Sequence, residues 1–172
     1  MDNILQAIHN CRKCLDACYD SVLPPAIYDG SIDAPILIVG QAPGIEEHAL
    51  IFQRYLCYPG KQPDGSGDRN PSSKQLDLCQ PHLARVLSLM TGLTMKLILP
   101  VGRLAINAFF PASKPLEEIV GQQMKYSQAL VIPLPHPSGL SRWHQKKEHR
   151  ALIYQALGLI RDLNLTSTPL PR

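Results

Sequence analysis

Four of the five cysteines in this chain of 172 residues are spaced as metal ligands are. Cys11-x-x-Cys14 presents two thiolates to one metal, and Cys57 and Cys79 supply two more from distant segments. Such a set suits either zinc or a [4Fe–4S] cluster, and the spacing alone favours zinc as the commoner structural metal. Cys18 closely follows Cys14, and we expect it to be a small buried hydrophobe, although its position leaves the choice of thiols open.

Two polar turns that follow apolar runs are candidates for a reaction centre. The turn "GQAPG", residues 40–44, follows "ILIV", and the turn "HPSG", residues 136–139, follows "VIPLP". Ligands bind beyond the carboxyl ends of the strands in open parallel sheets, so the two turns would face one another across a crevice if their strands are neighbours. The alternative is structural: Gly and Pro end strands, and His136 is then a hydrogen-bonded residue beside them.

The elements that would position these residues alternate between apolar runs and helical patterns. This order predicts an α/β fold, a three-layer α/β/α arrangement with a short, mostly parallel sheet. The run "APILIVG" is typical of a strand buried on both faces. The predicted strands are 34–40, 96–102 and 129–136, and the predicted helices are 2–9, 45–56, 72–90, 103–110 and 144–163.

Three further local features are expected from the sequence. Pro81 should kink the helix at 72–90, and Phe52 should pack in the core as part of the helix at 45–56. The segment "YPGKQPDGSGDRNPSS" predicts an irregular surface loop at 58–73, which either meets phosphates through its basic side chains or is merely solvated. We expect one domain over residues 1–172, with a frayed tail at 165–172.

Composition narrows the function classes only slightly. The net charge of +3 and the pI near 8.6 permit a polyanionic partner without establishing one. No apolar stretch is long enough for a membrane span, and the first residues lack the features of a signal peptide. We therefore expect a cytoplasmic monomer that is nucleoid-associated in a prokaryote, in a compartment where cysteines rarely form disulfides.

Taken together, these motifs resemble the uracil-DNA glycosylase superfamily, and most closely its iron–sulfur-containing family-four branch. "GQAPG" looks like the first active-site motif, and "HPSGLS", residues 136–141, looks like the second. The segment "LILPVGRLAINAFF" between them resembles the strand and helix that these proteins carry there, and the four cysteines follow the cluster-ligand order of that branch. The resemblance covers the chain to about residue 160 and favours [4Fe–4S] over zinc.

The resemblance implies roles for individual residues. His136 would donate a hydrogen bond to uracil O2, where negative charge develops as the base departs, and Gln41 would position a water or contact the base. Ser138 and the N–H groups around Gly139 would bind a phosphate, and Leu140 would fill the gap in the base stack. Arg142 and Trp143 would add a cation and an aromatic face, unless that loop instead docks Trp143 into the core. The full predicted substrate and DNA contacts are Gly40, Ala42, Pro43, Gly44, Ser138, Gly139, Leu140, Ser141 and Arg142.

The chain departs from the family pattern at two places. Family-four relatives carry an acid in the first turn and other branches an Asp one position later, where this chain has Gln41 and Ala42. The segment from Gly44 to Cys57 is shorter than in relatives and indicates an internal deletion. It leaves no visible aromatic platform for the base, and Glu46 and Glu47 are expected to serve a helix dipole.

Two main hypotheses for function follow. The first is a uracil-DNA glycosylase-like repair enzyme that hydrolyses the N-glycosidic bond of uracil or a related damaged base in DNA. The second is a catalytically weak or inactive iron–sulfur protein that binds nucleic acid, which the missing carboxylate and platform favour. A zinc-stabilised α/β domain with another function is a third alternative.

Overall fold

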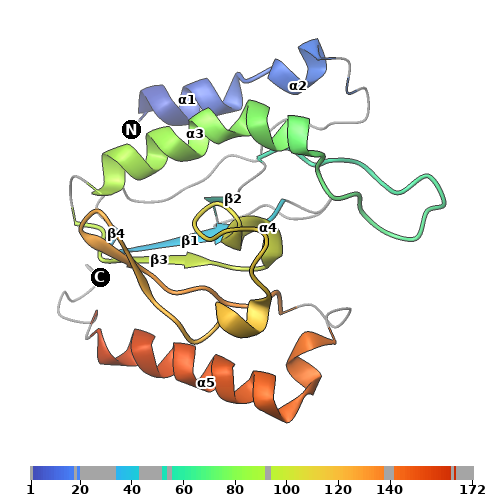
Figure 1. Ribbon diagram of the computed structural model, residues 1–172. Helices are drawn as coiled ribbons and strands as arrows, with labels where there is room; N and C mark the ends of the chain where they lie inside the picture. Colours follow the sequence, from blue (N-terminus) through green and yellow to red (C-terminus); the bar gives the residue numbers. More distant parts are fainter. Residues whose placement is uncertain are drawn as a thin grey trace, which may run out of the picture.

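The structure is a computed structural model that describes residues 2–17, 19, 34–42, 52–53, 56–91, 94–137, 142–163 and 165. It has three layers, with α1 and α3 over one face of a central sheet and α5 over the other (Figure 1). The predicted three-layer α/β/α class is confirmed. The helices are α1 (Asp2–His9), α2 (Lys13–Asp16), α3 (Ser73–Thr91), α4 (Arg103–Ile106) and α5 (Lys147–Asp162), with the 3-10 helices η1 (Leu116–Glu118) and η2 (Trp143–Gln145).

The sheet has five strands in the order β2-β1-β3-β5-β4. Three neighbouring pairs are parallel, and only β4 runs antiparallel, against β5. Because β1, β3 and β5 run the same way, their carboxyl ends meet at one edge of the sheet. The strands are β1 (Ile36–Gly40), β2 (Phe52–Gln53), β3 (Leu97–Pro100), β4 (Met124–Tyr126) and β5 (Ala129–Val131).

Side chains alternate between the two faces of the sheet, and each face has its own core. Leu37, Ile98 and Val131 belong to the larger cluster, which also holds Leu83 and Leu87 of α3. On the opposite face, Leu97 and Ile132 pack with Ala156 of α5. Fully burying one such aliphatic side chain contributes about 1.5–3 kcal/mol. These two cores hold the helices to the sheet and thereby fix the strand ends.

The prediction that the strand at 34–40 is buried on both faces is wrong. Leu37 and Val39 are buried, but Ile36 and Ile38 of β1 are each 37% exposed. The side chains packed with Ala156 of α5 come from β3 and from the end of β5, according to the part of the chain that the structure describes. The apolar run therefore predicted the strand correctly. Whether the second face of that strand is buried depends on how far α5 extends across the sheet.

The prediction of a helix over residues 45–56 is also wrong at the carboxyl end of that range. Phe52 and Gln53 form β2, which pairs in parallel with Val39 and Gly40 of β1. The exposed edge of β1 offers backbone partners that outweigh a local helical pattern. The side chain of Phe52 and the stretch 43–51 lie outside the described residues, so the predicted core role of Phe52 stays a prediction.

Most of the remaining elements agree with the sequence. The short helix before Cys11 is α1, and the helix at 72–90 is α3, which runs through Pro81. The expected kink at Pro81 stays a prediction. The hairpin of β4 and β5 was not predicted; its turn includes Ser127 at a φ of 52°. Among the described helices, none is long and apolar enough to cross a membrane.

Candidate functional site

Backbone hydrogen bonds also join the chain at the carboxyl ends of β1, β3 and β5. Val101 donates its N–H to the carbonyl of Val39 at 2.8 Å, and Gly102 donates to the carbonyl of Leu134 at 2.9 Å. A parallel bridge between Val101 and Leu134 continues the sheet by one step. Since β3 lies between β1 and β5, the strands before the two polar turns are not neighbours. The chain leaves the sheet at three adjacent points along one edge.

Gln41, the first residue after β1, reaches across the end of β3. Its Oε1 accepts a hydrogen bond from the N–H of Leu104 at 3.1 Å. Leu104 lies in the first turn of α4, where backbone N–H groups have no partner within the helix, and the N-cap residue Gly102 has no side chain to offer. Gln41 therefore caps α4 from a neighbouring turn.

Gly102 is the residue that allows this contact. Its φ is +86°, and a Cβ built there would lie 2.6 Å from Cδ of Gln41. We expect Gly102→Ala to lower the free energy of unfolding by about 2–4 kcal/mol, because a backbone at φ 86° and ψ 160° costs a side chain about 1–3 kcal/mol and the clash adds to it. Denaturant unfolding would measure the loss.

Gly65 provides the matched control for this substitution. It also has a positive φ, of +73°, but a Cβ there meets nothing within 4 Å. Gly65→Ala should therefore show the backbone cost alone, about 1–2 kcal/mol. Equal losses at the two positions would contradict a role for the Gln41 contact, and Gln41→Ala should recover part of the loss in the Gly102→Ala background.

The structure places the other predicted site residues as follows. Gly40 ends β1, and Ala42 is half-buried against the larger core. His136 and Arg142 are exposed, on either side of a stretch that is not described. Of the remaining predicted contacts, those outside the described residues are Pro43, Gly44, Ser138, Gly139, Leu140 and Ser141.

The four predicted ligand cysteines gather between α2, α3 and the segment after β2. Cys14, Cys57 and Cys79 are buried in the larger core, Cys11 is partly exposed, and none of the four forms a disulfide. Burial raises the pKa of the Cys57 thiol well above its ordinary value, and the nearby Cys79, Cys14 and Cys11 raise it further. Burial likewise raises the pKa of Cys79 to about 11, although the N–H of Leu56, 3.4 Å from its sulfur, acts in the opposite direction.

Four thiols in one region are chemically suitable for a metal. In this structure, however, they are not arranged around a single ion. No group of three or more Cys, His, Asp or Glu side chains is arranged to hold an ion within the described ranges, which omit Cys18. The donor set nevertheless fits a thiophilic metal, since four thiols from three segments act electrostatically on one another. The N–H of Leu56 that points to Cys79 is the kind of bond that supports a coordinated thiolate.

A known family model matches residues 46–158 of the chain, and its description is the uracil DNA glycosylase superfamily. The match spans more than half of the 172 residues. The chain belongs to this superfamily. No curated protein matches it.

The superfamily match covers only part of the predicted site. His136, Arg142, Cys57 and Cys79 lie within residues 46–158. The turn at 40–44 and the Cys11-x-x-Cys14 motif precede the matched stretch, so their assignment depends on the motif resemblance and on the contacts described above. The second motif thus lies within the stretch that matches the uracil-DNA glycosylase superfamily, and the first precedes it.

His82 also lies in the cysteine region, although it was not among the predicted ligands. Its Nε2 lies 3.2 Å from the sulfur of Cys11, and burial is the main cause that lowers its pKa, with Lys13 and Arg85 adding to the effect. The signal was present in the sequence, because Cys79-x-x-His82 places both side chains on one face of a helix. Lys13 also brings positive charge near Cys79.

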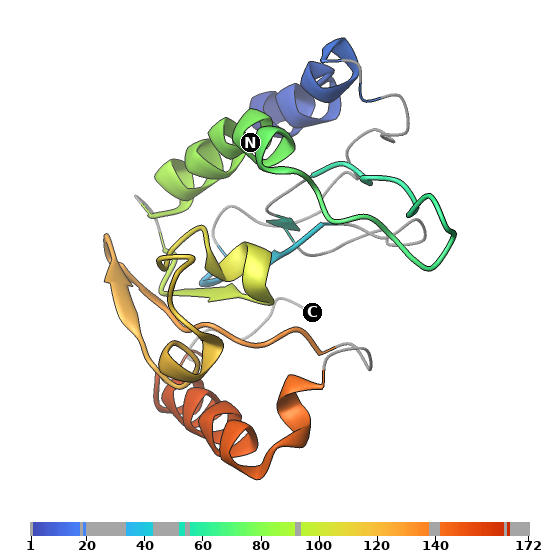
Figure 2. The same cartoon turned by 45° about the vertical axis from the view of Figure 1, so that its right-hand side comes forward.

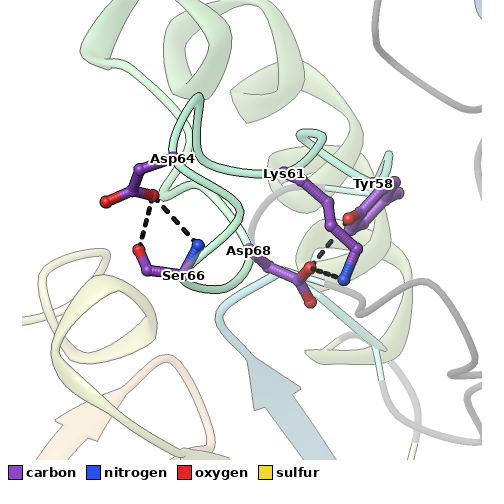
Figure 3. A network of polar contacts seen from close by, with 5 residues as sticks. All are labelled: Tyr58, Lys61, Asp64, Ser66 and Asp68. Atoms are coloured by element: carbon purple, nitrogen blue, oxygen red, sulfur yellow. Dashed lines mark hydrogen bonds and ion pairs between the residues drawn. The ribbon is translucent and has the colours of Figure 1, made fainter.

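The loop between β2 and α3 in this superfamily member is folded on itself (Figure 3). The Tyr58 hydroxyl donates to Oδ1 of Asp68 at 2.7 Å, and Nζ of Lys61 lies 3.6 Å from the same oxygen. Asp64 accepts hydrogen bonds from the N–H and the hydroxyl of Ser66, which hold the pKa of its carboxyl below the usual range. The predicted irregular loop is confirmed, and Lys61 already has an internal carboxylate partner.

Proposed function

We propose that the chain is a uracil-DNA glycosylase-like repair enzyme that hydrolyses the N-glycosidic bond of uracil, or of a related damaged base, in DNA. The observation that carries this proposal is the position of His136. It is exposed, it follows the strand extension at Leu134 on the carboxyl edge of the sheet, and it lies inside the stretch that matches the superfamily. This edge is where ligands bind in open parallel sheets.

In the proposed reaction, His136 donates a hydrogen bond to uracil O2 as negative charge develops on the departing base. A neutral imidazole is sufficient for this role, because it can donate a hydrogen bond without transferring the proton. Ser138 and the N–H groups around Gly139 would bind a phosphate beside the extruded nucleotide. Leu140 would fill the vacated stack, and the exposed Arg142 would contact the DNA backbone.

We further propose that Cys11, Cys14, Cys57 and Cys79 hold a [4Fe–4S] cluster, with zinc as the alternative, and that the chain belongs to the family-four-like branch. Three of these thiols are buried and the N–H of Leu56 points to the sulfur of Cys79, which supports a metal-binding role. When bound, the metal would cross-link α2, α3 and the segment after β2. We assign it a structural role and no part in the bond cleavage.

A second candidate function is favoured by the first turn. Gln41 bears no carboxylate, and its amide oxygen is used to cap α4. The shorter segment after Gly44, which we propose to be an internal deletion, lacks a visible aromatic platform for the base. These two features favour a homologue that binds DNA without turning it over.

One experiment separates the two candidates. The metal-replete protein is incubated with single- and double-stranded oligonucleotides that carry one uracil, and abasic sites are detected by alkaline cleavage. Strand breaks at the uracil position support the glycosylase. Salt-dependent binding without breaks supports the non-catalytic homologue, and absence of binding at low salt contradicts both.

A further inference from the structure

A compact polar cluster joins three segments next to the second motif. The indole N–H of Trp143 in η2 donates to Oε1 of Glu117 in η1 at 3.0 Å. Nε2 of His149 in α5 lies 3.2 Å from the same oxygen, and Nδ1 of His149 lies 2.7 Å from the carbonyl oxygen of Trp143. The rings of Trp143 and His149 are stacked, with centroids 4.2 Å apart and planes inclined by 15°.

The hydrogen-bond partners fix how the ring of His149 is placed. A carbonyl oxygen accepts hydrogen bonds and cannot donate them, so Nδ1 of His149 carries a proton and donates to Trp143. Nε2 then faces the carboxylate of Glu117, and the ring lies against the face of an indole. His149 is only 6% exposed, so water cannot readily replace these partners.

Glu117 supplies a negative charge to this arrangement. The pKa of Glu117 is lowered, chiefly by its own backbone N–H and then by the indole of Trp143 and the nearby His149 and Lys146. His144 is the titratable group of η2, and it lies next to Trp143 in the chain.

The position of the cluster connects it with the proposed function. The second motif begins at His136, just past the point where Leu134 is bonded to Gly102, and Arg142 immediately precedes Trp143. Both ends of the motif are therefore attached to the protein, one by backbone bonds and the other by this cluster. Figure 2 shows η2 beside the start of α5, on the side of the sheet where the strands end.

We propose that Glu117 and His149 are positioning residues for the DNA-contacting motif that runs from His136 to Arg142, and that the cluster they form with Trp143 holds its carboxyl end in place. This inference rests on the proposed function for the identity of the ligand. The existence of the anchor itself can be tested without any DNA.

The first test uses the fact that Trp143 is the only tryptophan. The cluster shields the indole, so the quenching constant for acrylamide in the full-length protein should rise by about threefold in Glu117→Ala, which removes the acceptor of the indole N–H. It should rise similarly in His149→Ala, which removes the stacked ring. Glu117→Gln keeps an acceptor for the indole and should show a smaller rise. His144→Gln is the matched control and should leave the quenching constant unchanged.

The second test measures the anchoring of the motif. Trypsin cleavage after the exposed Arg142, compared with cleavage after the exposed Arg161, should become about tenfold faster in His149→Phe, because loss of the cluster lets this segment open locally. On a uracil-containing duplex, KM should rise by about tenfold while kcat changes by less than about threefold, as expected when an interaction that positions bound DNA is lost. If the protein binds without turnover, Kd replaces KM.

Each outcome decides between the alternatives. An unchanged quenching constant in both Glu117→Ala and His149→Ala refutes the anchor. Increased quenching combined with unchanged DNA affinity in the variants shows a structural cluster only and refutes the positioning role. If the variants show increased quenching but the wild-type protein binds no DNA, the proposed function fails with the positioning role, while the cluster stands.

Discussion

Replacing Cys79 with alanine should remove the proposed metal centre and destabilise the protein by more than about 4 kcal/mol, because losing a structural metal is among the few changes with so large an effect. Cys79 is 4% exposed on α3 and accepts the N–H of Leu56 through its sulfur. It therefore connects the long helix with the segment that carries Cys57. Iron, sulfide and zinc content would be measured together with denaturant unfolding of the same preparation.

Cys18→Ala is the natural control for this prediction, because Cys18 is outside the proposed ligand set. It should leave the metal content unchanged and lower the free energy of unfolding by no more than about 1–2 kcal/mol, the cost of a lost buried sulfur. If no metal is bound by the wild type, Cys79→Ala removes only a buried sulfur and should cost about 1–2 kcal/mol. Such a small loss, with no metal found in native protein, would contradict the proposed centre.

The burial of the thiols adds a pH dependence to the same prediction. With the pKa of Cys57 raised and that of Cys79 raised to about 11, both thiols are protonated in the metal-free protein at neutral pH. Metal binding must then release these protons, so the apparent affinity for added zinc should rise as the pH rises. An affinity that does not change with pH would indicate that other groups bind the metal.

Substituting alanine for His136 should reduce kcat/KM on uracil-containing DNA by about 10²–10³-fold, the usual effect of removing one hydrogen-bond donor to a developing oxyanion. His136 is exposed, so the substitution should leave the unfolding midpoint and the DNA affinity close to the wild type. His136→Gln keeps an N–H donor and should recover part of the rate.

His9→Ala is the matched control, because His9 is an exposed histidine on α1, outside the stretch that matches the superfamily. Its rate should equal that of the wild type. A His136→Ala variant with undiminished cleavage would refute the assignment of the donor. It would leave superfamily membership intact, since that depends on the matched stretch as a whole.

The parts of the fold that could be predicted are those encoded by local pattern. Apolar runs located β1, β3 and β5, and helical periodicity located α3 and α5. The two-residue strand β2 could not be found in this way, because its pairing with Val39 and Gly40 depends on the free edge of β1 and not on the residues of β2 themselves. The exposure of Ile36 and Ile38 likewise depends on how far a distant helix extends over the sheet.

The candidate site likewise has features that a local sequence pattern predicts and features that it does not. The types and spacing of the cysteines were sufficient to group four of them, and Cys79-x-x-His82 could have added a fifth side chain. The cap that Gln41 provides to Leu104 links residues 63 positions apart, and no local pattern signals it. The contacts among Glu117, Trp143 and His149 arise from packing of η1 against α5, and no local sequence pattern predicts them either.

The locking of three strand ends by main-chain bonds has a consequence for how this protein can vary over evolution. The bonds from Val101 to Val39 and from Gly102 to Leu134 use backbone atoms, so they tolerate many side chains in the loops that follow. Loop residues can then be exchanged while the frame that carries them persists. An acid can give way to Gln41 in the first turn, and the lineage can change or lose its chemistry without losing its architecture.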